Sequence, residues 1–228
     1  MIDAGVDVGE ADADDTDTRA PAVRTGGPWD VDDAPGAGPR VDLGAILLPA
    51  VQGMELRMEI DKATGAVSAA AVSVEGSTLQ IQAFAAPRTE GIWDDIRAEI
   101  AESVIKQGGS ADDLPGPFGR ELLARLPVRT AEGRTGHRPA RFIGADGPRW
   151  FVRGVVTGKA AVDPAAAEVI ERIFSDIIVV RGREAGAPRA LLPMRIPGEQ
   201  PALVPDAAEP SAPSFDPMTR GPEITEIR

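Results

Sequence analysis

The side chains that most often act as nucleophiles or bases are nearly absent from this sequence. Its 228 residues include one histidine, no cysteine and no tyrosine. Acid–base and covalent catalysis near neutral pH rely mainly on such groups. The composition therefore favours a non-enzymatic protein without deciding the question, and it excludes disulfides, thiolate nucleophiles and cysteine-ligated metal sites.

Arginine is the remaining residue type whose placement suggests a site. Arg153 lies in an apolar segment, where it shares one face of a predicted strand with Phe151 and Val155. A guanidinium in such surroundings requires a carboxylate or a ligand anion as its partner. Two alternatives follow, an internal ion pair with Asp176 or Asp146 and a ligand-binding role.

Two more arginines, Arg141 and Arg149, lie on the same predicted hairpin as Arg153. Guanidinium groups bind carboxylates and phosphates through paired hydrogen bonds. A cluster of the three side chains would hold a small anionic ligand, in either a binding protein or an enzyme that acts on that ligand.

The search for other motifs is negative. Neither common type of glycine-rich phosphate-binding loop is present. His137 and the adjacent acids Asp112 and Asp113 lie in segments rich in glycine and proline. Solvated side chains are the usual outcome in such loops. We therefore predict no cofactor and no metal site, and we assign no catalytic residue.

Charge is distributed unevenly along the chain. The net charge is −7 over residues 1–40, −1 over residues 41–196 and −4 over residues 197–228. The nearly neutral core lacks the concentrated basic surface that nucleic-acid binding needs. No apolar run has the length of a transmembrane helix. We expect a cytoplasmic protein that binds neither nucleic acid nor membrane.

The two acidic ends differ in composition from the core. Residues 1–40 are rich in Asp, Ala, Gly and Pro, and residues 197–228 contain many prolines. Such segments bury too little apolar surface to offset the entropy of ordering, so both are predicted to be disordered tails. A chain lacking residues 1–40 should then still fold. Trp29 is the exception in the first tail, because it either docks on the core or a partner or stays in a flexible linker.

Residues 41–196 alternate between the periodicities of strands and helices. Apolar residues occupy every second position in 54–60 and 78–85, which predicts half-buried strands. They recur every four positions from Ile92 to Val104, which predicts a helix. The predicted strands are 54–60, 66–75, 78–85, 121–128, 138–145, 149–157 and 176–181, and the predicted helices are 91–107 and 164–174. This pattern predicts a single α+β domain, with a largely antiparallel sheet of about seven strands and two main helices.

Four strings in this order resemble an uncharacterised actinobacterial family, domain of unknown function 3710. They are Gly27–Val31, Leu79–Arg88, Gly116–Gly119 and Arg149–Phe151, and the resemblance covers roughly residues 27–197. It implies no known activity, so no functional residue is carried over from it. The order of elements is also similar to the Mog1/PsbP type of α/β sandwich, whose members usually bind partners, although a fold does not determine a function.

Three functions remain open at this point. The first is a non-enzymatic cytoplasmic adaptor that binds a protein partner, as the missing catalytic groups and the acidic tails suggest. The second is a binder of a small anionic ligand, or an enzyme acting on one, that uses Arg153 and Arg141. The third is a dimeric chaperone of the secretion type.

Overall fold

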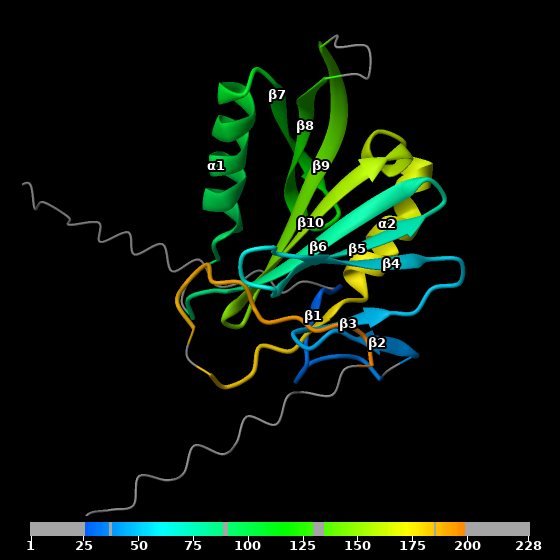
Figure 1. Cartoon of the computed structure of the whole chain (residues 1–228), viewed down its shortest axis with the longest axis vertical. Helices are drawn as coiled ribbons and strands as arrows, with labels where there is room; N and C mark the ends of the chain where they lie inside the picture. The colour runs from blue at the N-terminus through cyan, green and yellow to red at the C-terminus, as the bar shows by residue number, and fades with distance from the viewer. Residues whose placement is uncertain (1–25, 37, 89–90, 130–134, 185, 199–228) are drawn as a thin grey trace, which may run out of the picture. The chain divides into compact units, whose positions relative to one another are not determined.

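A computed structural model describes residues 26–36, 38–88, 91–129, 135–184 and 186–198 of the chain. These residues form two sheets and two α-helices, and the compact unit extends to Pro197 (Figure 1). The prediction of a single α+β domain with a seven-stranded antiparallel sheet and two main helices is confirmed.

The large sheet has the strand order β4-β5-β6-β10-β9-β8-β7, and every neighbouring pair is antiparallel. Its strands are β4 (Glu55–Ile60), β5 (Val67–Val74), β6 (Ser77–Ala85), β7 (Ser110–Gly116), β8 (Gly119–Arg129), β9 (Thr135–Gly147) and β10 (Trp150–Gly158). The helices are α1 (Trp93–Lys106), α2 (Pro164–Ser175) and the short 3-10 helix η1 (Lys159–Ala161).

A smaller sheet has the order β1-β11-β3-β2. Its strands are β1 (Trp29–Asp30), β2 (Arg40–Asp42), β3 (Ile46–Pro49) and β11 (Ile178–Val179). The β1–β11 pair is parallel, and the other two pairs are antiparallel. This sheet brings the first described strand, β1, next to β11, the last strand along the chain.

The alternation that predicts the strands also determines which face each residue occupies. In β6, Leu79, Ile81 and Ala83 are fully buried, whereas Gln80 and Gln82 are half-buried. Side chains at successive strand positions point to opposite faces of a sheet. One face of β6 therefore enters the main core, and the other face carries polar side chains.

The two helices lie on opposite faces of the large sheet. A Cβ on Gly144 would lie 2.4 Å from the Trp93 ring of α1, and a Cβ on Gly154 would lie 3.0 Å from the Phe174 ring of α2. Gly154 pairs with Ile143, the neighbour of Gly144, so the two glycines have opposite orientations. The residues that follow Trp150 on β10 thus alternate between the α2 side and the α1 side.

The acidic N-terminal segment joins the fold earlier than predicted. Trp29 N donates to Ile177 O at 2.8 Å, and Val31 N donates to Val179 O at 3.1 Å, so β1 is an ordered strand. This corrects the prediction that the tail extends to residue 40, and Trp29 docks on the core through its backbone. The rest of the predicted tails, residues 1–25 and 199–228, lies outside the described residues.

Two further predictions need correction. The segment that contains Asp112 and Asp113 was expected to be a loop, but it forms β7, the edge strand beside β8. The last predicted strand does not join the large sheet, because β11 pairs with β3 and β1 instead. The strand is buried all the same, since Ile178 is 3% exposed and Val179 is fully buried.

Neither α1 nor α2, nor any other helix in the described part of the chain, combines the length and the apolar character that crossing a membrane requires.

The contact between Asp30 of β1 and Trp150 of β10 generates a prediction about stability. The Trp150 Nε1 donates to Asp30 Oδ2 at 2.6 Å, and the Trp150 side chain is 1% exposed. Asp30→Ala would leave this buried donor without its partner, which costs about 1–3 kcal/mol. Urea unfolding followed by tryptophan fluorescence measures this loss.

Asp33→Ala is the matched control, because Asp33 is an exposed acid in the same segment. We expect its free energy of unfolding to equal that of the wild type. Equal stability of Asp30→Ala and Asp33→Ala would show that the hydrogen bond between Trp150 and Asp30 contributes nothing to the stability of the fold.

Candidate functional site

The structure separates the three arginines that the sequence placed on one hairpin. Arg141 pairs with Val156 in the β9–β10 register, and Arg153 pairs with Gly144. Residues that pair directly lie on the same face of the sheet. Gly144 and Arg141 lie an odd number of positions apart on β9, so their side-chain positions face opposite sides. Arg141 therefore lies on the α2 face and Arg153 on the α1 face. Arg149 lies in the turn between the strands, where its Nη2 donates to Gly182 O at 3.3 Å, so the three arginines do not form one patch.

Arg153 is held between an aromatic ring and an amide. Its guanidinium lies 5.6 Å from the Phe84 ring centroid, and its Nη2 donates to Gln82 Oε1. The Gln82 amide is oriented by its own hydrogen bond from Nε2 to Ser68 O at 3.0 Å. Arg153 Nε is buried and has no hydrogen-bond partner in the structure. Desolvation by burial lowers the pKa of the Arg153 guanidinium.

The predicted internal ion pair of Arg153 is not formed. Asp146 accepts hydrogen bonds from Ile92 N at 2.8 Å and Trp93 N at 3.3 Å, at the start of α1. Asp176 offers its backbone carbonyl to Arg40. None of the ion pairs among the described residues includes Arg153. The half-buried guanidinium therefore has an amide as its acceptor where a carboxylate was expected.

Arg153 lies at the border between a covered part and an open part of the sheet. Helix α1 packs on β7, β8 and β9, and Figure 1 shows it beside these strands. On the same face, β4, β5, β6 and β10 carry mainly small or polar side chains. These are Glu55, Arg57, Glu59, Ala71, Ser73, Thr78, Gln80, Gln82, Arg153, Val155 and Thr157. We call this set the open sheet face.

The acids of the open sheet face are already engaged. Glu59 Oε2 accepts from Gln80 Nε2 at 2.6 Å, and Glu55 Oε2 pairs with Arg57 Nη2 at 3.3 Å. Both pairs lie on or next to β4, at the edge of the sheet. The open sheet face therefore presents Arg153 as a half-buried cation that forms no ion pair with a carboxylate of the described residues.

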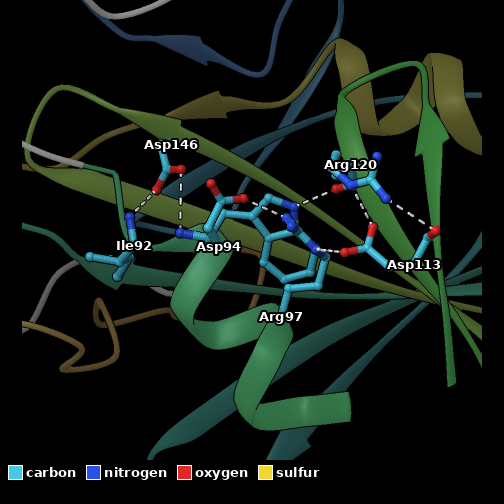
Figure 2. A network of polar contacts seen from close by, with 7 residues as sticks. Ile92, Asp94, Arg97, Asp113, Arg120 and Asp146 are labelled. Carbon is cyan, nitrogen blue, oxygen red and sulfur yellow. Dashed lines mark hydrogen bonds and ion pairs between the residues drawn. The ribbon is translucent and has the colours of Figure 1, made fainter. Parts of the chain in front are cut away.

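A polar network fixes α1 in its place (Figure 2). Arg97 is 9% exposed, and its guanidinium pairs with Asp94 at 2.5 Å and with Asp113 at 3.1 Å. Asp113 also pairs with Arg120 at 2.7 Å, and Trp93 Nε1 donates to Arg120 O at 2.7 Å. Burial and this hydrogen bond show that Trp93 is a core anchor, since the residue is 5% exposed. The network holds α1 against β7 and β8, so it determines which strands remain uncovered.

Arg141 belongs to a second charged cluster, on the α2 face. Its Nη2 contacts Glu171 Oε1 of α2 at 2.5 Å, and its Nη1 lies 3.7 Å from Glu121 Oε1 of β8. The three side chains are largely buried, with exposed fractions of 12% for Arg141, 25% for Glu171 and 9% for Glu121. Two carboxylates therefore share one guanidinium.

Glu121 is the least satisfied member of this cluster. Its Oε2 is buried and accepts no hydrogen bond in the structure. Desolvation by burial raises the Glu121 pKa, which Arg141 partly counteracts and Glu171 reinforces. The carboxylate lies against the backbone of Gly116, where an added Cβ would come within 2.1 Å of Oε2. Only glycine at this position leaves room for the Glu121 side chain.

Glu121 and Arg141 of this cluster line a cavity of about 160 Å³ between the β7–β8 hairpin and the N-terminal end of α2. We call this space the hairpin cavity. Its lining comes from the sheet and from the η1–α2 segment, and it comprises Leu114, Glu121, Leu123, Arg141 and residues 160–164. Leu114 is 38% exposed and Val162 is 62% exposed, so an apolar rim continues onto the surface.

The roles of Glu121 and Glu171 in this cluster were not predicted from the sequence. Glu171 could have been found, because it lies four residues after the buried Ala167 and three before the buried Phe174, at the border of the apolar stripe of α2. Glu121 had no such signal. Its burial depends on the β8–β9 register, which places Leu123 opposite Arg141.

The other residues discussed in the sequence analysis either are exposed to solvent or stabilise the fold. His137 is exposed on β9, and Asp112 is exposed on β7. Asp113 is used in the α1 network. A search of the described residues found no group of histidine and acidic side chains arranged to hold a metal ion.

Comparison with known proteins gives one match. The family model described as "Protein of unknown function (DUF3710)" matches residues 27–202, which is most of the chain. The chain belongs to this family. The match begins just before β1, the first strand of the described fold, and the family description carries no activity. No curated protein and no solved structure matches this family member, so the likeness to the Mog1/PsbP sandwich stays a prediction.

The contact of Trp93 with Gly144 predicts that α1 cannot tolerate a side chain beneath it. Gly144→Ala would place a Cβ 2.4 Å from the buried Trp93 ring, and overpacking of this kind costs about 1–3 kcal/mol. Thermal unfolding should show a lower Tm. Gly36→Ala serves as the control because a Cβ there meets nothing within 4 Å. A Tm of Gly144→Ala equal to that of Gly36→Ala would contradict the packing of α1.

The raised pKa of Glu121 predicts a pH dependence of stability. The native state binds the Glu121 proton more tightly than the unfolded chain. Between the ordinary glutamate pKa of about 4.3 and the higher native value, stability therefore falls as the pH rises. Glu121→Gln removes this titration, so the variant should lose less stability than the wild type between about pH 4 and pH 7.

Urea unfolding at a series of pH values measures this difference. Glu168→Gln, on the exposed side of α2, is the control and should follow the wild-type profile. Parallel profiles for Glu121→Gln and the wild type would mean that Glu121 is not desolvated in the native state.

Proposed function

We propose that this family member is a non-enzymatic protein-binding module, and that it holds a carboxylate-bearing segment of its partner on the open sheet face at Arg153. A cytoplasmic location, predicted from the sequence, belongs to the same proposal. The observation that carries the proposal is the half-buried Arg153 guanidinium, which has no carboxylate partner among the described residues.

The charge of Arg153 is the first support. Burial lowers its pKa, which means that desolvation disfavours the charged form and that an opposite charge would relieve the cost. A partner carboxylate next to Arg153 would supply that charge and an acceptor. Arginine is also enriched among the residues that contribute most to binding energy at protein interfaces.

The shape of the surroundings is the second support. The open sheet face consists of strands whose side chains are small or polar, and the Phe84 ring next to Arg153 is half-buried. An arginine stacked on an aromatic ring keeps its guanidinium in one orientation, so a partner loses less entropy when it binds there. A broad face of this kind fits an extended protein segment.

The prediction is that Arg153→Gln weakens partner binding while the fold is retained. Wild-type and variant chains would be used to purify the partner from the cells that produce the protein, and the purified partner would then be titrated by calorimetry. We expect the dissociation constant to rise at least about tenfold for Arg153→Gln, in keeping with an interface arginine. Arg172→Gln, on the exposed side of α2, should bind as the wild type does.

The possible outcomes separate the function classes. Equal affinity of Arg153→Gln and the wild type would overturn the proposed site. A thermal-shift screen of small carboxylates and phosphates tests the alternative, because a ligand at about 100 times its dissociation constant adds roughly 2.7 kcal/mol of stability. A shift that disappears in Arg153→Gln would favour the small-ligand function over the protein partner.

A further inference from the structure

We infer that the hairpin cavity is a second binding site, on the opposite face of the sheet from Arg153, and that it takes the ammonium group of a lysine side chain from a protein partner. This inference does not depend on the function proposed for Arg153. It rests on the charge balance, the unsatisfied oxygen and the shape of the cavity.

The charge balance of the cavity is negative. Glu121 and Glu171 both face Arg141, at 3.7 Å and 2.5 Å, so two carboxylates share a single guanidinium. Glu171 lies behind Arg141, outside the lining, and Asp163 adds a second carboxylate to that of Glu121 in the lining itself, where its Oδ1 also accepts a hydrogen bond from Ala165 N at 3.0 Å. An anion entering this space would meet an excess of negative charge, whereas a cation would be attracted.

The unsatisfied oxygen identifies the type of cation. The Glu121 side chain is 9% exposed, and its Oε2 has no hydrogen-bond donor in the structure, whereas Oε1 faces Arg141. A guanidinium fork binds best to two parallel acceptors, but Glu121 has only one oxygen without a partner. That oxygen is buried beside Gly116, so the carboxylate must turn toward the cavity when the cation binds. An ammonium group acts as a point charge with rotatable donors and can satisfy a single oxygen. Such a charge would also reverse the rise in the Glu121 pKa.

The shape of the cavity fits an aliphatic stem. The polar cluster lies beside apolar lining from Leu114, Leu123, Val162 and Pro164. Lysine side chains bury their methylene stems along apolar surface while the charged end reaches a polar group. The exposed rim at Leu114 and Val162 would then be covered by the residues around the lysine of the partner. This rim is the reason for assigning the ammonium to a protein partner.

The experiment is a titration of the isotope-labelled full-length chain with n-butylammonium, followed by the amide resonances of the cavity residues. We expect saturable shifts at residues of the β7–β8 hairpin and of 160–164, with millimolar affinity, as befits a probe of so few atoms. n-Butanol has the same stem without the charge and should bind at least about tenfold more weakly. Equal shifts with both probes would overturn the inference, as would the lack of saturable shifts.

Three variants locate the binding group. Glu121→Gln should weaken n-butylammonium binding at least about tenfold, because it removes the charge at nearly constant shape. Glu168→Gln and Arg153→Gln should leave it unchanged, since both side chains lie outside the cavity lining. If Glu121→Gln does not fold, Glu171→Gln alters the same charge balance at a more exposed residue and should also weaken binding. Unchanged binding in the folded variant would contradict the site.

A second probe distinguishes a partner lysine from a free amine. N-acetyl-lysine methylamide adds peptide groups next to the stem, where they can contact the rim at Leu114 and Val162. We expect it to bind at least as tightly as n-butylammonium. Binding of n-butylammonium without binding of the lysine derivative would overturn the assignment to a protein partner and leave a site for a free small amine.

Discussion

The close approach of both helices to the centre of the large sheet is the constraint on which the other features depend. It requires Gly144 on β9 and Gly154 on β10, because a Cβ at either position would press on Trp93 or Phe174. The two glycines lie on adjacent strands and opposite faces, so each helix packs where the sheet is thinnest. In the described part of the chain, α1 covers β7, β8 and β9 only, and the regions that the two helices leave uncovered include the open sheet face and the hairpin cavity.

The two uncovered regions carry opposite unbalanced charges. Arg153 lies on the α1 side without a carboxylate, whereas Glu121 and Glu171 compete for Arg141 on the α2 side. Burial of each cluster raises the cost of the imbalance, because water no longer screens it fully. The two proposed binding sites therefore lie on opposite faces of the sheet and would take groups of opposite charge.

Much of the fold could be predicted from the sequence, and the reasons are local. Each regular spacing of apolar residues marks an element with one buried face. Such spacing occurs as alternation in 54–60 and 78–85, and as a four-residue repeat from Ile92 to Val104. The elements that escaped prediction depend on distant partners. β7 contains two aspartates and a proline, and it forms a strand because β8 pairs with it and because Asp113 meets Arg97 and Arg120. β1 has two residues, too few for any periodicity, and its partner β11 comes near the other end of the fold.

The features of the candidate site also divide into those that the sequence predicts and those that only the structure reveals. The sequence by itself determined that catalytic nucleophiles are scarce, that the core is nearly neutral and that Arg153 occupies an apolar strand, because these depend on residue types and their spacing. Only the tertiary structure decided that Arg141 and Arg153 face opposite sides, that Glu121 is buried and that Trp29 belongs to a sheet. Strand register and contacts between distant segments determine these features, and neither leaves a local pattern in the sequence.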